Sequence, residues 1–294
     1  MDDQQIVGRY CGRPFSRQEI EWIGALISGE PSISRQQVSK RFCEYAGWRK
    51  PDGGLKDMSC RVALLKMSRS GILRLPVRKK SQSRANKKVS RTRAGARAAD
   101  IYKKAGEFDL QFQIVNQTNS ALWNELISRY HYQGYTPLPG AQLRYFVQAE
   151  EGIVALLGFS AAAWSAEARD RWIGWDGPHR KQNLQYIVNN SRFLILPWIH
   201  SKGLASRILS KAVKRLVGDW HARYNYRPLL AETFVERDRF KGTCYKAAGW
   251  RCVGETKGRG KLDVASEYKL PVKTIWVKPL QVDFRAHLCG EPIG

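Results

Sequence analysis

The stretch HSKGLASRILSKAVKRL, His200–Leu216, places Gly203 and Ala205 at the start of a predicted helix, directly after an apolar run. Apolar residues recur at helical spacing through the stretch, which indicates a helix with one buried face. Backbone N–H groups at a helix start lack partners and the helix dipole is positive there, so two small residues leave room for a diphosphate. Lys202 and Arg207 add positive charge beside them. We therefore expect a strand, a turn and a helix, with a phosphate seat at the turn formed by Lys202, Gly203, Ala205 and Arg207.

Strand and helix patterns alternate on both sides of this unit. Two apolar runs, 143–147 and 153–159, flank a polar turn and predict a hairpin. The other predicted elements are strands at 112–117, 191–198, 228–235 and 251–256, a helix at 121–132, and a short helix or turn at 242–250. This alternation predicts an α/β (α+β) domain with a mixed sheet at 105–270, followed by a C-terminal strand and tail at 271–294.

The first 77 residues carry a different pattern. A serine followed three positions later by Glu or Gln, as in Ser16–Glu19 and Ser34–Gln37, is a capping box that marks a helix start. A third helix is indicated around Val62–Met67 and stops at Gly71, and the apolar residues of Ile72–Leu75 predict a short strand. This order of elements is typical of a winged helix, so 1–77 is predicted to be a winged-helix-like module.

In such a module the third helix enters the major groove of DNA and its outward polar residues reach the base edges. The candidate DNA contacts of this helix are Lys56, Arg61, Lys66 and Arg69. The alternative is an ordinary small helical bundle whose exposed face is basic.

The chain has a net charge of +24, from 50 Lys plus Arg against 26 Asp plus Glu. Such a surplus of positive charge favours a polyanionic partner. We expect nucleic acid and not a membrane, because the sequence has no amphipathic lipid-binding stretch. The cations are densest at 78–104, which we interpret as a basic linker that stays flexible until phosphates neutralise it. Its candidate contacts are Lys87, Lys88, Arg91 and Arg93. Weak, nonspecific binding by a basic protein is the alternative.

Two further polar segments are candidates for nucleic-acid contact. The segment VGETKGRGK, Val253–Lys261, alternates glycines with Lys257, Arg259 and Lys261, a composition suited to phosphate. The segment NNSR ends at Arg192 and offers two amides and a guanidinium to base edges or phosphate. A flexible basic loop and turn-forming asparagines are the respective alternatives.

No run of about 18 apolar residues occurs, and the first residues lack the pattern of a signal peptide, so we expect a cytoplasmic protein without a membrane partner. A metal-dependent nuclease is a further alternative, because its divalent metal needs at least two converging carboxylates. The residues that could build such a site are Asp170, Asp176, Glu232, Glu236, Asp238 and Lys241. No zinc site is predicted, since the chain has no C-x-x-C pair.

At its glycine motif the chain resembles the GNAT acetyltransferase superfamily. The family's pyrophosphate motif is Gln/Arg-x-x-Gly-x-Gly/Ala, which residues 200–205 match except at His200. The later YKAAGW, Tyr245–Trp250, resembles the family's Tyr-x-x-x-Gly-aromatic signature. The resemblance implies a GNAT-like fold with acetyl-CoA as cofactor and Tyr245 as the residue that protonates the departing thiolate. Glu232 is the candidate base, and a strand-end salt bridge is its alternative.

A closer resemblance runs through longer phrases, among them GFSAAAW, RDRWIGWD, IVNNSRFLILPW and ETFVERDRFKGTCYKAAGW. Together with SRQQVSKRFCEYAGW and SRSGILRLPV near the N-terminus, these phrases resemble the DruA family of the Druantia anti-phage defence system over almost the whole chain. The resemblance implies work on DNA, with other components of the system, including a helicase-like partner, as protein partners. Whether the α/β domain is an enzyme stays open at this point.

Overall fold

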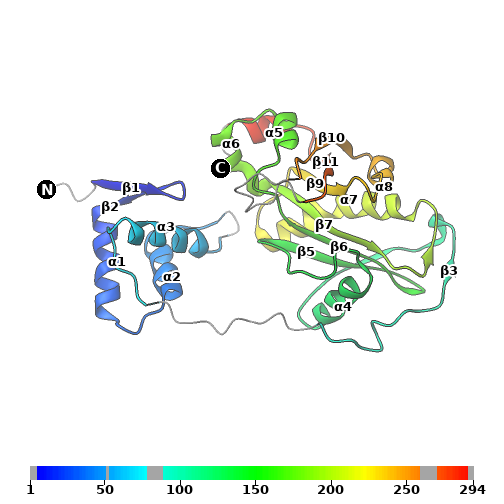
Figure 1. Cartoon of the computed structure of the whole chain (residues 1–294), viewed down its shortest axis with the longest axis horizontal. Coiled ribbons are helices and arrows are strands. Elements are labelled where there is room, and N and C mark those ends of the chain that lie inside the picture. The colour runs from blue at the N-terminus through cyan, green and yellow to red at the C-terminus, as the bar shows by residue number, and fades with distance from the viewer. Residues whose placement is uncertain (1–4, 51–52, 78–88, 259–269, 291–294) are drawn as a thin grey trace. The chain divides into compact units, whose positions relative to one another are not determined.

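The computed structural model describes residues 5–50, 53–77, 89–258 and 270–290 of the chain (Figure 1). The chain divides into two units, Met1–Lys87 and Lys88–Gly294, each with its own hydrophobic core. No helix among these residues is both long and apolar enough to span a bilayer.

The first unit begins with a two-stranded ribbon, β1 (Ile6–Tyr10) and β2 (Arg13–Ser16), followed by the helices α1 (Arg17–Gly29), α2 (Arg35–Tyr45) and α3 (Asp57–Arg69). Both predicted capping boxes are confirmed: Ser16 accepts the Glu19 N–H and Ser34 accepts the Gln37 N–H, each at 3.2 Å. Each cap stabilises its helix by about 1 kcal/mol because it satisfies an otherwise unpaired N–H group.

The end of this unit differs from the prediction. The predicted strand at Ile72–Leu75 is wrong, because residues 73–77 have no regular structure and the ribbon precedes α1 instead. The Arg35 side chain donates to the Pro76 carbonyl at 2.7 Å, so side chains rather than a strand partner hold this segment. Val62 and Leu65 are exposed, while the buried residues of α3 are Cys60, Ala63, Leu64 and Met67. The winged-helix interpretation of this unit therefore stays a prediction.

The second unit is built on a seven-stranded mixed sheet in the order β10-β11-β9-β7-β6-β5-β4. Neighbouring strands are antiparallel except β7 and β9, which are parallel. The strands are β4 (Gln111–Ile114), β5 (Gln142–Ala149), β6 (Gly152–Ala161), β7 (Ile187–Ile195), β9 (Leu230–Glu236), β10 (Arg251–Glu255) and β11 (Lys273–Pro279). The α/β prediction with a mixed sheet is confirmed, and the C-terminal strand lies between β9 and β10.

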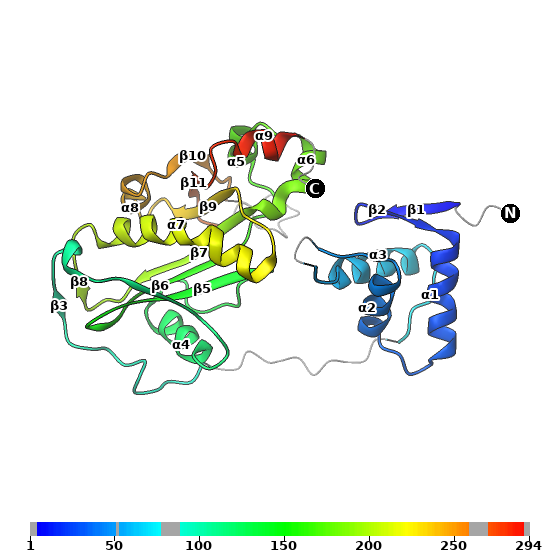
Figure 2. The ribbon, with the colours of Figure 1, turned by 180° about the vertical axis from the view of Figure 1, so that it is seen from behind.

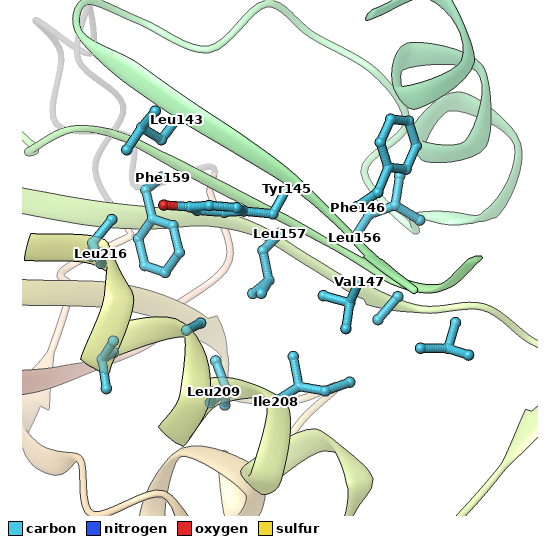
Figure 3. Packing of buried hydrophobic residues seen from close by; sticks show 14 of the residues in the cluster. Leu143, Tyr145, Phe146, Val147, Leu156, Leu157, Phe159, Ile208, Leu209 and Leu216 are labelled. Atoms are coloured by element: carbon cyan, nitrogen blue, oxygen red, sulfur yellow. The ribbon is translucent and has the colours of Figure 1, made fainter. Parts of the chain in front are cut away.

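Helices cover both faces of this sheet (Figures 1 and 2). The longest helix, α7 (Leu204–Tyr224), packs along one face, and α4 (Ser120–Tyr130) lies against the other. Figure 3 shows Ile208, Leu209 and Leu216 of α7 pointing toward Leu157 and Phe159 of the sheet. The remaining short elements are β3 (Ile101–Tyr102), β8 (Ile199–His200), α5 (Glu167–Ile173), α6 (Gly177–Asn183), α8 (Thr243–Ala247), α9 (Phe284–Cys289) and two 3₁₀ turns (Ala105–Glu107, Leu184–Tyr186).

The described part of the predicted linker, residues 89–104, is ordered against the second unit. Strand β3 pairs in parallel with β8, and residues 92–95 form hydrogen bonds to α4. The expectation of a flexible linker is therefore wrong for 89–104, because local charge composition does not show which side chains elsewhere in the chain anchor a segment.

Candidate functional site

The polar centre of the second unit lies where β7 and β9 diverge. These parallel strands pair only over Ile187–Asn189 and Leu230–Glu232, although both continue beyond that point. Past it, β7 continues to pair with β6 and β9 with β11. The gap between them is therefore an opening in the sheet whose two sides are each held by another strand.

Asn190 of β7 is the hub of the hydrogen bonds in this gap. Its side-chain oxygen accepts the Tyr245 hydroxyl at 2.8 Å, and its backbone carbonyl accepts the Thr233 hydroxyl at 3.0 Å. Its amide group donates to the Gly158 carbonyl at 3.3 Å. Burial raises the pKa of Tyr245, so the phenol keeps its proton at neutral pH. The predicted Tyr245 thus lies in the gap, but its hydroxyl is committed to Asn190.

Two cavities open into the gap. The Tyr245 cavity, of about 400 Å³, is lined by residues of α8, β7 and β9 and by Tyr130–Gln133. The Arg192 cavity, of about 380 Å³, is lined by residues of β7, by Phe234 and by the 136–139 loop. Asn190 and Ser191 line both. Cavities of this size take small ligands or parts of larger ones.

The Tyr245 cavity also contains a buried histidine. Burial, with the nearby Arg192 and Arg239, lowers the pKa of His131 to about 4. The ring is therefore neutral at pH 7, and its Nδ1 lies 3.2 Å from the Gln133 backbone N–H, which donates to it. A neutral imidazole beside two guanidinium groups leaves this part of the gap cationic overall.

Glu232, the predicted base, is fully buried at the point where β7 and β9 part. One of its oxygens accepts from the Arg169 guanidinium and the other from the Ala163 N–H, each at 2.8 Å. Burial raises the pKa of Glu232 even though Arg169 pulls in the opposite direction. With both oxygens engaged, this carboxylate holds α5 to the sheet, which agrees with the salt-bridge alternative and not with a free base.

Three other carboxylates of the nuclease alternative, Asp170, Asp176 and Asp238, are engaged as well, whereas no ion pair or side-chain hydrogen bond of Glu236 occurs among the described residues. Asp170 pairs with Arg169 at 2.7 Å and with Arg180 at 3.4 Å, and Asp176 caps α6 by accepting the His179 N–H at 2.8 Å. Within residues 5–50, 53–77, 89–258 and 270–290, no group of three or more His, Cys, Asp or Glu side chains that could hold a metal ion occurs. We therefore assign no metal ligand among these side chains.

The start of α7 keeps part of the predicted phosphate seat. Gly203 has a φ of +84°, a conformation that other residues rarely adopt, and Lys202 beside it is exposed. A side chain at Gly203 would meet nothing closer than the Ala105 methyl at 4.0 Å, so the turn is open. Arg207, in contrast, donates to the carbonyls of Ala105 and Phe108 and is not directed at a ligand. A cavity of about 440 Å³ lies beside the turn.

Residues 91–95 form a second cationic feature, which we name the arginine turn. The buried carboxylate of Glu125 accepts the Thr92 N–H at 2.6 Å and the Thr92 hydroxyl at 2.8 Å. The Tyr130 hydroxyl donates to the Gly95 carbonyl at 3.1 Å. On this fixed backbone Arg91 and Arg93 are exposed, and neither forms an ion pair with any side chain that the structure describes.

Glu125 holds this turn as an ionised carboxylate. Burial opposes its ionisation, but the hydrogen bonds from Thr92 and the ion pair with Arg129, at 2.5 Å, lower the pKa of Glu125 below its ordinary value. The carboxylate is therefore charged at neutral pH and its charge is satisfied internally. The guanidinium groups of the turn stay available to a partner.

The remaining predicted cations are scattered. On α3, Lys66 and Arg69 are exposed and Arg61 pairs with Asp57 at 2.9 Å, while Lys56, just before the helix, is half-buried. Lys257 pairs with Glu167 at 2.7 Å. Lys87, Lys88, Arg259 and Lys261 lie outside the described residues. The structure thus brings Arg192, Tyr245 and Glu232 to one gap, whereas the start of α7 and the arginine turn are separate features.

Neither Asn190, the hub of the gap, nor Glu125, the anchor of the arginine turn, stands out in the sequence as a site residue. Asn190 was noted only as one of two amides in NNSR, which proves to be part of β7 and not a turn. A signal for Glu125 exists, because this carboxylate lies on α4 among the buried Trp123, Leu126 and Ile127. A charge on an apolar helix face requires a partner, and a segment rich in N–H donors is one such partner.

Solved structures similar to this chain are acetyltransferases. An aminoglycoside acetyltransferase in complex with coenzyme A is 14% identical, with a TM-score of 0.38, over 60% of this chain and 98% of that one. The ribosomal-protein-S18-alanine N-acetyltransferase from Escherichia coli is 8% identical, with a TM-score of 0.36, over 59% and 95%. A polyamine N-acetyltransferase of Drosophila melanogaster is 11% identical, with a TM-score of 0.38, over 58% and 100%.

Among curated proteins, the comparison finds no match. The family described as Druantia protein DruA matches residues 66–269, which is well over half of the sequence and includes α7, the gap between β7 and β9 and the arginine turn. The chain therefore belongs to the DruA family of the Druantia system.

Proposed function

We propose that this chain serves Druantia anti-phage defence by binding nucleic acid through cations that its fold holds in place. The arginine turn carries the proposal, because Arg91 and Arg93 project from a backbone that Glu125 fixes. Other exposed arginines do have carboxylate partners, since Arg17 pairs with Glu21 and Arg171 with Glu167. The carboxylate beside the turn, Glu125, instead binds the backbone and hydroxyl of Thr92, so the two arginines can meet an outside anion.

A fixed turn binds phosphate at lower cost than a flexible linker does. Ordering a free segment costs about 1–2 kcal/mol per residue, whereas these residues are ordered before a strand arrives. The net charge of +24 favours the approach of any polyanion, and phosphate contacts then supply affinity that does not depend on sequence. Contacts from Lys66 and Arg69 of α3 and from Lys202 stay predictions.

The experiment measures the affinity of the full chain for a fluorescent DNA duplex and for a single strand at low salt. We expect Arg91→Ala/Arg93→Ala to weaken binding by roughly tenfold or more, because two phosphate contacts are lost. The matched control is Arg17→Ala/Arg171→Ala, which removes the same charge from exposed side chains that already have carboxylate partners. An equal loss in both double variants would show that only net charge matters and would contradict the role of the turn.

A second candidate function, acyl transfer from coenzyme A, is favoured by the Tyr245 cavity together with the open start of α7. The residues present fit this cofactor in part. Lys202, Gly203 and Ala205 would hold its phosphates, whereas Arg207 is engaged with carbonyl groups. When bound, the cofactor would supply the activated acyl group. Tyr245 holds a proton at its hydroxyl in the cavity, but that proton is donated to Asn190.

This second candidate is tested by thermal unfolding with coenzyme A. A ligand that binds only the native state stabilises it by about 2.7 kcal/mol when its concentration is one hundred times its Kd. We therefore expect a clear rise in Tm if coenzyme A binds at the start of α7. Gly203→Glu should abolish the rise, while Gly203→Ala controls for the backbone strain at a φ of +84°. A Tm that does not change with cofactor would remove this function.

Membership in the family supports other components of the defence system as protein partners. A helicase-like component among them stays a prediction, and co-purification of the tagged full chain with the other components would test it.

A further inference from the structure

Among the described residues, the lining of the Arg192 cavity carries positive charge and no acidic side chain. Two of its lining residues, Arg192 and Lys273, are cations, and neither forms an ion pair within the part of the chain that the structure describes. The Arg192 guanidinium donates to the Ser191 carbonyl and to the Thr136 hydroxyl, both at 2.7 Å, and both acceptors are neutral. No Asp or Glu occurs among the described lining residues. A half-buried cation in this setting favours an anionic ligand.

Two residues that line the cavity each have a buried side-chain atom without a hydrogen-bond partner among the described residues. These atoms are the Arg192 Nε, a donor, and the Asn189 Oδ1, an acceptor. Buried polar groups are satisfied in nearly all native proteins, so each calls for an explanation. Because neither atom is exposed to solvent, a ligand in the cavity would reach them only after the two side chains turn toward it.

The lining also has an apolar part that suits a flat ring, beside the polar residues Gln133, Thr136, Asn190, Ser191 and Thr256. Phe234 of β9 lines the cavity together with Leu138 and the two prolines that flank it in the 136–139 loop. Aromatic side chains stack on nucleobases with a gain of about 1–3 kcal/mol per base. Asparagine amides pair with base edges, and a volume of about 380 Å³ accommodates a small ligand.

We propose that the Arg192 cavity takes one unstacked nucleotide of a single-stranded nucleic acid, with the phosphate on Arg192 and Lys273, the ring against Phe234 and the base edge on Asn189. This inference rests on the proposed function, because it takes nucleic acid as the partner. It adds that the nucleic acid is single-stranded and that one nucleotide binds in the Arg192 cavity. A base inside a duplex has its pairing edge and both faces occupied, so it enters such a pocket only after leaving the stack.

The first experiment compares the binding of the full chain to fluorescent oligodeoxythymidine and to the same strand in a duplex with oligodeoxyadenosine. We expect Asn189→Ala and Arg192→Gln each to weaken single-strand binding by about tenfold, because a base-edge or phosphate contact is lost. Duplex affinity should change by less than about twofold, because phosphate contacts outside the pocket supply it. Arg171→Gln, which removes one exposed charge, is the control and should leave both affinities unchanged.

The second experiment locates the base directly. Photo-crosslinking with oligonucleotides that carry thiothymidine should label the peptide containing Phe234, and Arg192→Gln should abolish that label while the variant keeps the wild-type Tm. Labelling confined to other peptides would overturn the proposal even if affinities changed.

The outcomes separate this inference from the proposed function. If the cavity variants bind single strands normally while Arg91→Ala/Arg93→Ala does not, the cavity proposal fails and the proposed function stands. If the wild-type chain binds neither single strand nor duplex, both fail. Free thymidine monophosphate is tested as a competitor of the labelled oligonucleotide. If it competes as well as unlabelled oligonucleotide at the same nucleotide concentration, the ligand is a free nucleotide and the assignment to a strand is overturned.

Discussion

Arg169 is completely buried, and its charge is balanced by Glu232 at 2.8 Å and Asp170 at 2.7 Å. Glu232→Gln keeps an acceptor for the Ala163 N–H but leaves Arg169 with one carboxylate. Breaking a buried pair by removing one partner costs roughly 3–5 kcal/mol, and we expect the lower end because Asp170 remains. Urea unfolding measures the loss, and Glu167→Gln, which removes two exposed pairs, should cost less than about 1 kcal/mol. Equal costs would contradict the structural role of Glu232.

His131 predicts a pH dependence of stability. Its pKa falls from 6.5 to about 4 on folding, so between these values the unfolded chain holds a proton that the folded chain lacks. Stability is therefore lost as the pH falls from 6.5 toward 4, by about 2–3 kcal/mol at pH 4.5 for this residue. His131→Asn keeps an acceptor for the Gln133 N–H. Between pH 7 and 4.5, its free energy of unfolding should fall by about 2–3 kcal/mol less than that of the wild type. Parallel pH profiles of variant and wild type in urea unfolding would exclude this cause.

At the residue scale, the sequence identified Tyr245 and Glu232 but not what they do. The partner of the Tyr245 hydroxyl is Asn190, 55 residues away, and the partner of Glu232 is Arg169, 63 residues away. A motif shows which side chain is present, whereas its protonation and its freedom to react depend on partners that only the fold brings near.

The arginine turn gives a prediction at the scale of an element. A methyl group at Gly95 would collide with the Glu125 carboxylate, which is buried and held by Thr92 and Arg129. Gly95→Ala should therefore detach the turn, lower stability by about 1–3 kcal/mol and speed trypsin cleavage after Arg91 and Arg93. It should also weaken nucleic-acid binding without removing a charge.

Gly106→Ala is the control for that prediction, because a methyl group there would meet no atom within 4 Å. Both variants are compared by limited trypsin digestion with peptide mapping and by urea unfolding. If Gly95→Ala is cleaved at the wild-type rate, the turn is not held in the way that the contacts with Glu125 indicate.

Elements specified by local signals were predictable, and those set by long-range pairing were not. The starts of α1 and α2 follow from capping boxes whose two side chains lie three positions apart, and the structure has both. The strand predicted at Ile72–Leu75 failed because an apolar run forms a strand only where a partner strand exists. The position of β11 between β9 and β10 was likewise beyond reach, since a strand pattern does not name its neighbours.

At the scale of the whole molecule, the surplus of 24 positive charges predicts strong salt dependence of nucleic-acid binding. Each phosphate contact releases counterions and adds about 0.9 to the slope of log K against log salt for a duplex, so six to ten contacts would lower the affinity by about 10³–10⁵ between 50 and 200 mM salt. Fluorescence anisotropy titrations of the full chain over this range measure the slope. Arg91→Ala/Arg93→Ala should reduce it by about 2, whereas Arg17→Ala/Arg171→Ala should leave it nearly unchanged because those cations already have carboxylate partners. A slope near zero for the wild type would mean that the surplus charge has another purpose, because a polyanion cannot be bound through its phosphates without releasing its counterions.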